Sequence, residues 1–301
     1  MTSLGAVDIG SNSVRLFIAS ADGAPQCREM HITRLAEGVD RTGRLAEAAM
    51  GRTLEVLAQY ADLLARHGTT RLRVTGTSAA RDAENRAEFF ARVKNTLGSA
   101  PELLSGQAEA ALAFRGATED REPAFGPFVT LDIGGGSTEF AYGTSEPEQS
   151  ISLDIGCVRI TERFFTSDPP SETELAAAAQ YIRGLLQKVE REVRCRAAKT
   201  WLGLAGTVTS LAARDAGLSA YDPKVTHGYA LGRERVEKMH SELTQLSIEQ
   251  RAHWLMEPKR AGVILGGSVI LVEVLRFFEL SEITVSERDI LDGLVASLRD
   301  P

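Results

Sequence analysis

One short motif occurs twice in this chain, once in each half. Residues 8–13 read Asp-Ile-Gly-Ser-Asn-Ser, and residues 132–137 read Asp-Ile-Gly-Gly-Gly-Ser. Each copy lies between two apolar runs that are typical of β-strands, at 4–7 and 16–19 and at 128–131 and 140–142. Small residues let consecutive N–H groups approach an anion, and a carboxylate at the strand end can hold a divalent cation. The repeat therefore predicts two matched phosphate-binding hairpins.

Composition restricts the class of protein. The chain has 301 residues, of which 43% are hydrophobic and 25% charged, which fits a globular protein of two domains. A net charge of −7 argues against general binding to nucleic acid or to anionic membranes. The three cysteines have no metal-ligand spacing, and the N-terminus does not read as a signal peptide. We therefore expect a cytoplasmic protein with reduced thiols.

Strand-like and helix-like segments alternate along both halves, which favours α/β domains. A charged segment with two prolines at 117–127 is the best candidate linker, so we expect domains at 1–124 and 125–301. A terminal helix at about 289–299 is expected to pack back on the first domain. Ligands of such sheets bind at the carboxyl ends of strands. The two repeated turns, together with 76–78 and 206–207, should therefore meet in the cleft between the domains.

Further motifs follow the first one in a fixed order. They are Gly-Thr-Ser-Ala-Ala-Arg at 76–81, Leu-Ser-Gly-Gln-Ala-Glu-Ala at 104–110, the second repeat with Thr138 and Glu139, Gly-Leu-Ala-Gly-Thr at 203–207, and Val-Ser-Glu-Arg-Asp at 285–289. With these motifs the chain resembles the exopolyphosphatase and guanosine pentaphosphate phosphohydrolase family, in its short two-domain form. The resemblance implies two actin-like (ribonuclease H-like) domains, with mixed sheets flanked by helices and an active-site cleft between them.

Two positions depart from the family pattern. Members often carry two acids after Ser-Gly-x, whereas here Ala108 precedes the single acid Glu109. The usual Gly-Leu-Arg-Glu-Gly near the end is replaced by residues 289–293, Asp-Ile-Leu-Asp-Gly. Substrate contacts that the family assigns to that segment are therefore in question for this chain.

The resemblance implies roles for four acids. Glu109 is expected to orient the attacking water and take its proton; the alternative is an acid that only complements a helix dipole. Asp132, Asp8 and Glu139 are expected to serve Mg²⁺, with Mn²⁺ as a substitute. Either aspartate would instead be a cap of its own turn, and Glu139 a solvated strand residue.

Phosphate ligands are expected mainly from the two turns. The predicted set is Ser11, Asn12, Ser13, Arg15, Arg81, Gly134, Gly135, Gly136, Ser137, Thr138, Gly206 and Thr207. Arg15 takes the place in the first hairpin that Glu139 has in the second, which predicts that hairpin one grips phosphate while hairpin two supports metal and water. Basic residues of the second half, Arg260 among them, would suit a track for a chain of phosphates; the alternative, which we favour, is an ordinary solvated face.

These observations predict a Mg²⁺-dependent exopolyphosphatase that removes the terminal phosphate of linear inorganic polyphosphate. Guanosine pentaphosphate is the alternative substrate, since the chemistry is the same. A kinase or ATPase of the same superfamily would need an adenosine pocket, for which no signature is found. A non-catalytic polyphosphate or alarmone sensor is a third reading, favoured by Ala108. Nucleic acid and membranes are not expected as partners, and a homodimer is expected only by analogy.

Overall fold

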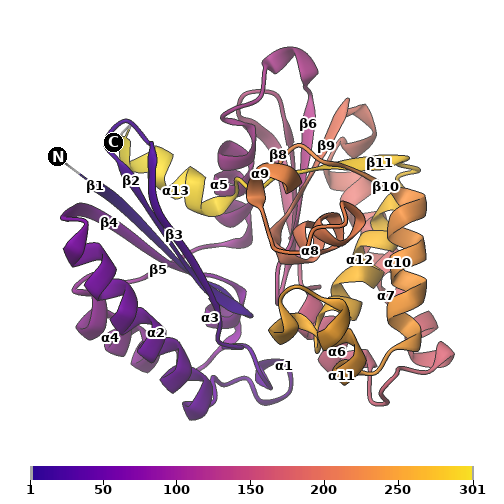
Figure 1. Ribbon diagram of the computed structural model, residues 1–301, viewed down its shortest axis with the longest axis horizontal. Coiled ribbons are helices and arrows are strands. Elements are labelled where there is room, and N and C mark those ends of the chain that lie inside the picture. The colour runs from indigo at the N-terminus through magenta and orange to yellow at the C-terminus, as the bar shows by residue number, and fades with distance from the viewer. Residues whose placement is uncertain (1–2, 300–301) are drawn as a thin grey trace.

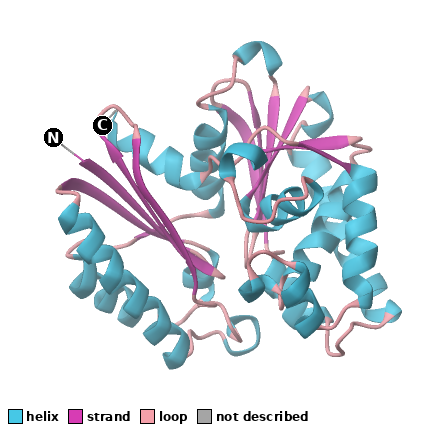
Figure 2. Ribbon diagram, in the orientation of Figure 1, coloured by secondary structure: helices cyan, strands magenta, loops and turns pink. Residues whose placement is uncertain are grey.

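The computed structural model describes residues 3–299 and contains two mixed β-sheets that stand side by side (Figures 1 and 2). The first sheet has the order β3-β2-β1-β4-β5. Its strands are β1 (Ser3–Ile9), β2 (Ser13–Ser20), β3 (Pro25–Ile32), β4 (Thr69–Gly76) and β5 (Glu102–Leu103). The three N-terminal strands form an antiparallel meander, and β4 and β5 extend the sheet from β1 in parallel.

The second sheet repeats this plan. Its order is β10-β11-β9-β6-β7-β8, with an antiparallel meander of β6, β7 and β8 and parallel additions of β9 and β11. The bounds are β6 (Phe128–Ile133), β7 (Thr138–Gly143), β8 (Pro147–Leu153), β9 (Thr200–Leu204), β10 (Ala230–Gly232) and β11 (Glu282–Val285). The repeated motif thus corresponds to a repeated topology, and the predicted α/β class with two mixed sheets flanked by helices is confirmed.

Further helices surround the two sheets. In the first half these are α1 (Val39–Thr42), α2 (Glu47–Arg66), α3 (Ser78–Asp82) and α4 (Arg86–Leu97). The second half has α6 (Cys157–Phe164), α7 (Glu172–Glu192), α8 (Ala205–Asp215), α9 (Pro223–Thr226), α10 (Arg233–Gln245), α11 (Ile248–Trp254) and α12 (Ile264–Phe277). Apolar positions of α2 and α7 recur at helical spacing and are buried, while their other faces are polar, so each helix has one side to pack.

Two helices fill the space between the sheets. α5 (Gly106–Thr118) contacts β6, β7 and β8, whereas α13 (Ile290–Arg299) contacts β1, β2 and β4 and also packs on α5 (Figure 1). Their approach requires glycine: a Cβ at Gly116 would lie 1.9 Å from the Asp289 carbonyl oxygen, and one at Gly293 would lie 2.0 Å from that of Leu112. This contact fixes the start of α13 close to the hairpin that joins the end of β1 to the start of β2.

The apolar core has three clusters of buried residues. One lies under each sheet's outer helices, and the third joins the halves. The third combines Leu4 and Phe17 of the first sheet with Phe128 and Leu202 of the second, around residues of α5 and α13. The terminal helix therefore lies against the first sheet, while α5, which precedes residue 124, lies against the second. The division of the chain at residue 124 stays a prediction. No helix within residues 3–299 is long and apolar enough to cross a bilayer.

Candidate active site

A cavity lies where β1, β4, β6 and β9 end. Its lining includes most of the residues predicted for the site: Asp8, Ser11, Asn12, Ser13, Arg15, Glu109, Asp132, Gly134, Gly135, Gly136, Ser137, Gly206 and Thr207. Segments that are up to two hundred residues apart in the chain thus meet, because carboxyl ends of parallel strands lie at one edge of each sheet. Three predicted residues, Arg81, Thr138 and Glu139, are not part of this lining.

The two repeated turns lie directly against each other at the cavity. We call residues 10–13 loop 1 and residues 134–137 loop 2. A Cβ on Gly135 would lie 2.8 Å from the Cβ of Ser11 and 2.9 Å from the amide nitrogen of Asn12. One on Gly136 would lie 2.8 Å from the Ser11 hydroxyl oxygen. Glycine in loop 2 therefore allows a direct backbone approach that any side chain would prevent.

Both loops leave amide groups available for an anion. In residues 3–299, the N–H groups of Ser11 and Asn12 in loop 1 have no protein acceptor, and neither do those of Gly135, Gly136 and Ser137 in loop 2. Buried amides are nearly always hydrogen-bonded, so a group of free amides at a cavity indicates a bound acceptor. Phosphate oxygens are suitable acceptors, as they are in other anion nests of consecutive N–H groups.

Glu109 lies in the first turn and a half of α5, at the cavity. The helix begins at Ser105, whose hydroxyl accepts from the Ala108 amide at 3.2 Å. Arg81 donates to the Glu109 carboxylate at 2.7 Å and to the Leu104 carbonyl at 3.1 Å. Burial raises the pKa of Glu109 to about 7, and Asp8 adds to this, although Arg81 and Arg15 act in the opposite direction. A carboxyl group with this pKa can accept a proton near neutral pH.

Arg81 contacts two residues of the cavity wall. Its guanidinium donates to Glu109 and lies 3.3 Å from the Ser137 hydroxyl, although Arg81 itself is not among the lining residues. It therefore holds both side chains in place, and its predicted role as a phosphate ligand stays a prediction. Thr138 is turned away from the cavity: its hydroxyl donates to the Ile155 carbonyl at 2.6 Å, inside the core.

Asp8 forms an ion pair inside the first hairpin. The Arg15 Nη2 atom lies 2.7 Å from its carboxylate, because the two residues are opposite each other in the β1–β2 ladder. Arg15 also pairs with Asp289 at the start of α13, which in turn binds Arg28 at 3.2 Å. Burial alone would raise the pKa of Asp289, but Arg15 and Arg28 outweigh it and hold that pKa below its usual value. The departure from the family pattern at residue 289 thus supplies a partner for Arg15.

Asp132 has the same place in the second hairpin but no such partner. Opposite it in the β6–β7 ladder stands Glu139, another acid. Burial, with the charges of Asp289, Glu109 and Asp8, raises the pKa of Asp132 to about 7, although Arg15 lowers it. Burial and the charges of Glu109 and Asp132 also raise the pKa of Glu139 well above its usual value. Glu139 is buried and accepts from the Ser152 hydroxyl at 2.7 Å.

The residues present fit Mg²⁺ only in part. Among the described residues, no group of three or more His, Cys, Asp or Glu side chains forms a metal site. Mg²⁺ is commonly held by one or two carboxylates, with water and substrate phosphate completing its shell. Asp132, at the cavity and without a cationic hydrogen-bond partner, has the chemistry of such a ligand. Asp8 is paired with Arg15, and Glu139 stands opposite Asp132 in the β6–β7 ladder, so the metal roles of these two acids stay predictions.

Two cavity residues were missed or misread from the sequence. Arg260, which the sequence places among solvated basic residues, lines the cavity, and its guanidinium lies against Gly206. No carboxylate within residues 3–299 forms a salt bridge with it, so its charge is available to an anion. Ala205 adopts a left-handed conformation (φ 63°) where β9 turns into α8. Nothing in the sequence signals this strained turn, since alanine is an ordinary helix residue.

Comparison with known proteins gives consistent likenesses over both halves. A model of the Ppx/GppA phosphatase family matches residues 18–300. "Exopolyphosphatase 2" of Mycobacterium tuberculosis is 42% identical over 99% of this chain and 99% of its own length. The crystal structure of an Aquifex aeolicus Ppx/GppA family member superposes with a TM-score of 0.82, at 33% identity over 99% of this chain and 97% of that one. An exopolyphosphatase from Cytophaga hutchinsonii gives a TM-score of 0.91, at 25% identity over 99% and 98%.

Proposed function

Because this chain belongs to the Ppx/GppA phosphatase family, we propose that it is an exopolyphosphatase that hydrolyses the terminal phosphoanhydride bond of linear inorganic polyphosphate with Mg²⁺ as cofactor. The name of the mycobacterial relative supports this substrate. The observation that carries the proposal is the position of Glu109, a buried carboxyl group with a pKa of about 7 at a cavity that is lined by two sets of free amides.

In this proposal, each group at the cavity has a separate role in hydrolysis. The amides of loops 1 and 2 hold the oxygens of the terminal phosphate, Arg15 donates to them beside its two carboxylate partners, and Arg260 offsets the charge of the chain end. Glu109 accepts a proton from water as the water oxygen bonds to the terminal phosphorus. The bond from phosphorus to the bridging oxygen breaks, and inorganic phosphate and a chain shorter by one unit are released. Arg81 keeps the Glu109 carboxylate in position.

Asp132 would hold Mg²⁺ in this proposal, and Asp8 would contribute mainly through its pair with Arg15. The ion would supply charge neutralisation at the scissile phosphate.

Guanosine pentaphosphate is the second candidate substrate, for one structural reason. A cavity of about 670 Å³ adjoins the phosphate cavity and shares Arg15, Gly206 and Arg260 with it. Apolar and aromatic groups, among them Tyr221 and Leu291, line it as well. Its size and lining suit a nucleoside attached to the phosphate chain.

Phosphate release from three substrates tests the proposal: long-chain polyphosphate, tripolyphosphate and guanosine pentaphosphate, each with Mg²⁺, Mn²⁺ or a chelator. We expect release from polyphosphate, its loss in chelator, and a fall in kcat of about 10³-fold in Glu109→Gln. The matched control is Glu102→Gln, an exposed acid of β5 that pairs with Arg73 away from the cavity. Hydrolysis by Glu109→Gln at the wild-type rate would contradict the assignment of the base.

A further inference from the structure

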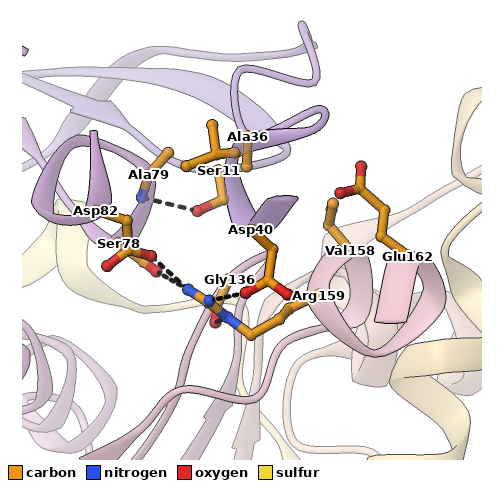
Figure 3. A pocket seen from close by; sticks show the side chains of 11 residues that line it. Ser11, Ala36, Asp40, Ser78, Ala79, Asp82, Gly136, Val158, Arg159 and Glu162 are labelled. Atoms are coloured by element: carbon orange, nitrogen blue, oxygen red, sulfur yellow. Dashed lines mark hydrogen bonds and ion pairs between the residues drawn. The ribbon is translucent and has the colours of Figure 1, made fainter. Parts of the chain in front are cut away.

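A small hollow behind the two loops contains an arginine that no part of the proposed mechanism uses. It lies between α1, α3 and α6, and it shares Ser11, Ser78 and Gly136 with the phosphate cavity (Figure 3). Arg159 of α6 lines this hollow and is not part of the lining of the phosphate cavity. Its side chain is only 12% exposed, which is low for an arginine outside a binding site.

The start of α6 binds the carbonyl groups of loop 2 one after another. The amides of Cys157 and Val158 donate to the carbonyls of Gly134 and Gly135, each at 2.9 Å. The carbonyl of Gly136 has no backbone donor within residues 3–299, and the Arg159 Nε atom donates to it instead at 2.8 Å. Three consecutive carbonyls of loop 2 are therefore bound by α6, two by backbone amides and the third by the Arg159 side chain.

These contacts determine where the amides of loop 2 point. In a planar trans peptide the C=O of one residue and the N–H of the next point in opposite directions. Because the Gly136 carbonyl is held toward α6, the Ser137 N–H points away from α6. In the same way, the bonds to the carbonyls of Gly134 and Gly135 direct the N–H groups of Gly135 and Gly136 away from α6. Those three N–H groups are the ones without a protein acceptor. If the Gly136 peptide turned over, a carbonyl oxygen would face the phosphate.

The other two nitrogens of the same guanidinium bind the first half of the molecule. Nη1 pairs with Asp40 of α1 and Nη2 with Asp82 at the end of α3 (Figure 3). The same short helix α3 carries Ser78, whose hydroxyl lies 3.5 Å from Nη2, and Arg81, which holds Glu109. Arg159 therefore connects loop 2 to the helix that positions the base.

We propose that Arg159 is a positioning residue of the phosphate site, which sets the direction of the Ser137 amide and holds loop 2 in register with α3. This inference rests on the proposed function, since it assigns the three amides to phosphate. Arg159 does not touch the substrate. Its effect is transmitted through the Gly136 carbonyl and through Asp82.

A neighbouring arginine provides a matched control. Arg163 lies one turn further along α6 and donates to the same Asp40 at 2.9 and 3.0 Å, and to the Tyr181 hydroxyl at 2.9 Å. Among its described contacts there is none with loop 2 or α3. An arginine that only joins the two halves would behave like Arg163, whereas a positioning residue would not.

The test compares Arg159→Ala, Arg159→Lys and Arg163→Ala with the wild type in phosphate release from polyphosphate and in melting temperature. For Arg159→Ala we expect kcat to fall about 10- to 100-fold, with a smaller change in KM, because misdirected amides lose most of their stabilisation of the charge that develops on the phosphate oxygens in the transition state. For Arg163→Ala we expect a rate within about twofold of wild type and a melting temperature similar to that of the wild type. Low millimolar guanidinium chloride should restore part of the activity of Arg159→Ala and none in Arg163→Ala.

Equal losses in the two alanine variants, or a wild-type rate in Arg159→Ala, would overturn the proposal. Hydrogen exchange of a peptide covering residues 154–165 provides a readout that needs no activity, since the Cys157 and Val158 amides are protected by loop 2 carbonyls. Exchange should be faster in Arg159→Ala than in Arg163→Ala. If wild type releases no phosphate, the proposed function fails while this exchange difference still tests the coupling of Arg159 to loop 2. Equal exchange in the two variants refutes the coupling whatever the activity.

Discussion

Loop 1 and loop 2 have nearly the same sequence and face the same cavity, but they are held differently. The carbonyls of Ser11 and Asn12 accept from backbone amides of residues 33, 34 and 36, the chain that follows β3. Loop 2 is held by the start of α6 and by the side chain of Arg159. Loop 1 is therefore fixed within its own half of the molecule. Loop 2 depends on an arginine that is also paired with the other half.

The strand positions behind the loops differ in charge. In the β1–β2 ladder Asp8 stands opposite Arg15, whereas in the β6–β7 ladder Asp132 stands opposite Glu139. An acid opposite a base is neutralised locally, but two acids opposite each other remain short of positive charge. The duplicated motif thus carries an ion pair in one copy and, in our proposal, a cation-binding carboxylate in the other.

Exchanging each aspartate for its amide should separate these two roles, with the largest effects on rate. We expect Asp132→Asn to lower kcat at saturating Mg²⁺ by about 10²-fold or more, because it removes the proposed metal ligand. We expect a smaller loss of rate for Asp8→Asn, about tenfold, because Arg15 keeps Asp289. Steady-state phosphate release as a function of Mg²⁺ measures both, and equal losses would contradict the comparison.

The two variants should differ in the sign of their effect on the free energy of unfolding: the variant that loses more activity should be the more stable one. The pKa of Asp132 is raised by folding, so the folded state binds more protons than the unfolded state and loses stability as pH rises from about 4 to about 7. At pH 8 without metal, Asp132→Asn should therefore raise the melting temperature by roughly 2–4 °C for each kcal/mol gained. Asp8→Asn should lower it, since a buried guanidinium loses a partner. Calorimetry at pH 8 checks both signs.

The spacing of the loops can be tested at Gly135. A methyl group there would meet Ser11 and Asn12 at less than 3 Å, so loop 2 would have to move away from loop 1. We expect Gly135→Ala to reduce kcat/KM by about tenfold or more, since displacement of positioned groups by tenths of an ångström weakens transition-state contacts. Gly184→Ala on α7 is the control, because nothing lies within 4 Å of its added methyl group. That variant should keep its activity and gain roughly 0.5–1 kcal/mol in the free energy of unfolding.

The smallest expected effect of a substitution is a shift in the pH dependence of kcat when Arg81 is replaced. Glu109 acts as a base only when ionised, so kcat should rise with pH through about 7 and fall about tenfold per unit at lower pH. Arg81 lowers the pKa of Glu109, so Arg81→Met should move this limb to higher pH as well as reduce the rate. Arg163→Met should leave the limb in place. An unchanged limb in Arg81→Met would show that another group titrates.

The α/β class and the duplicated hairpins could be read from the amino-acid sequence alone. Both depend on local patterns, namely strand periodicity and small residues in turns, which are legible without knowledge of distant contacts. The convergence of both loops with residues 76–78 and 206–207 followed from the rule that ligands bind at strand ends.

Which charges meet depends on the folded arrangement of the chain. Arg15 finds Asp289, Arg81 finds Glu109, and Arg159 finds Gly136, Asp40 and Asp82, although these partners lie between 23 and 274 residues apart. Sequence distance carries no information about such pairs, since they depend on how α5, α6 and α13 pack between and around the two sheets. For the same reason Arg260 was grouped with a solvated basic face, and nothing in the sequence pointed to Arg159. Their importance depends on burial and on partners, which exist only once the chain is folded.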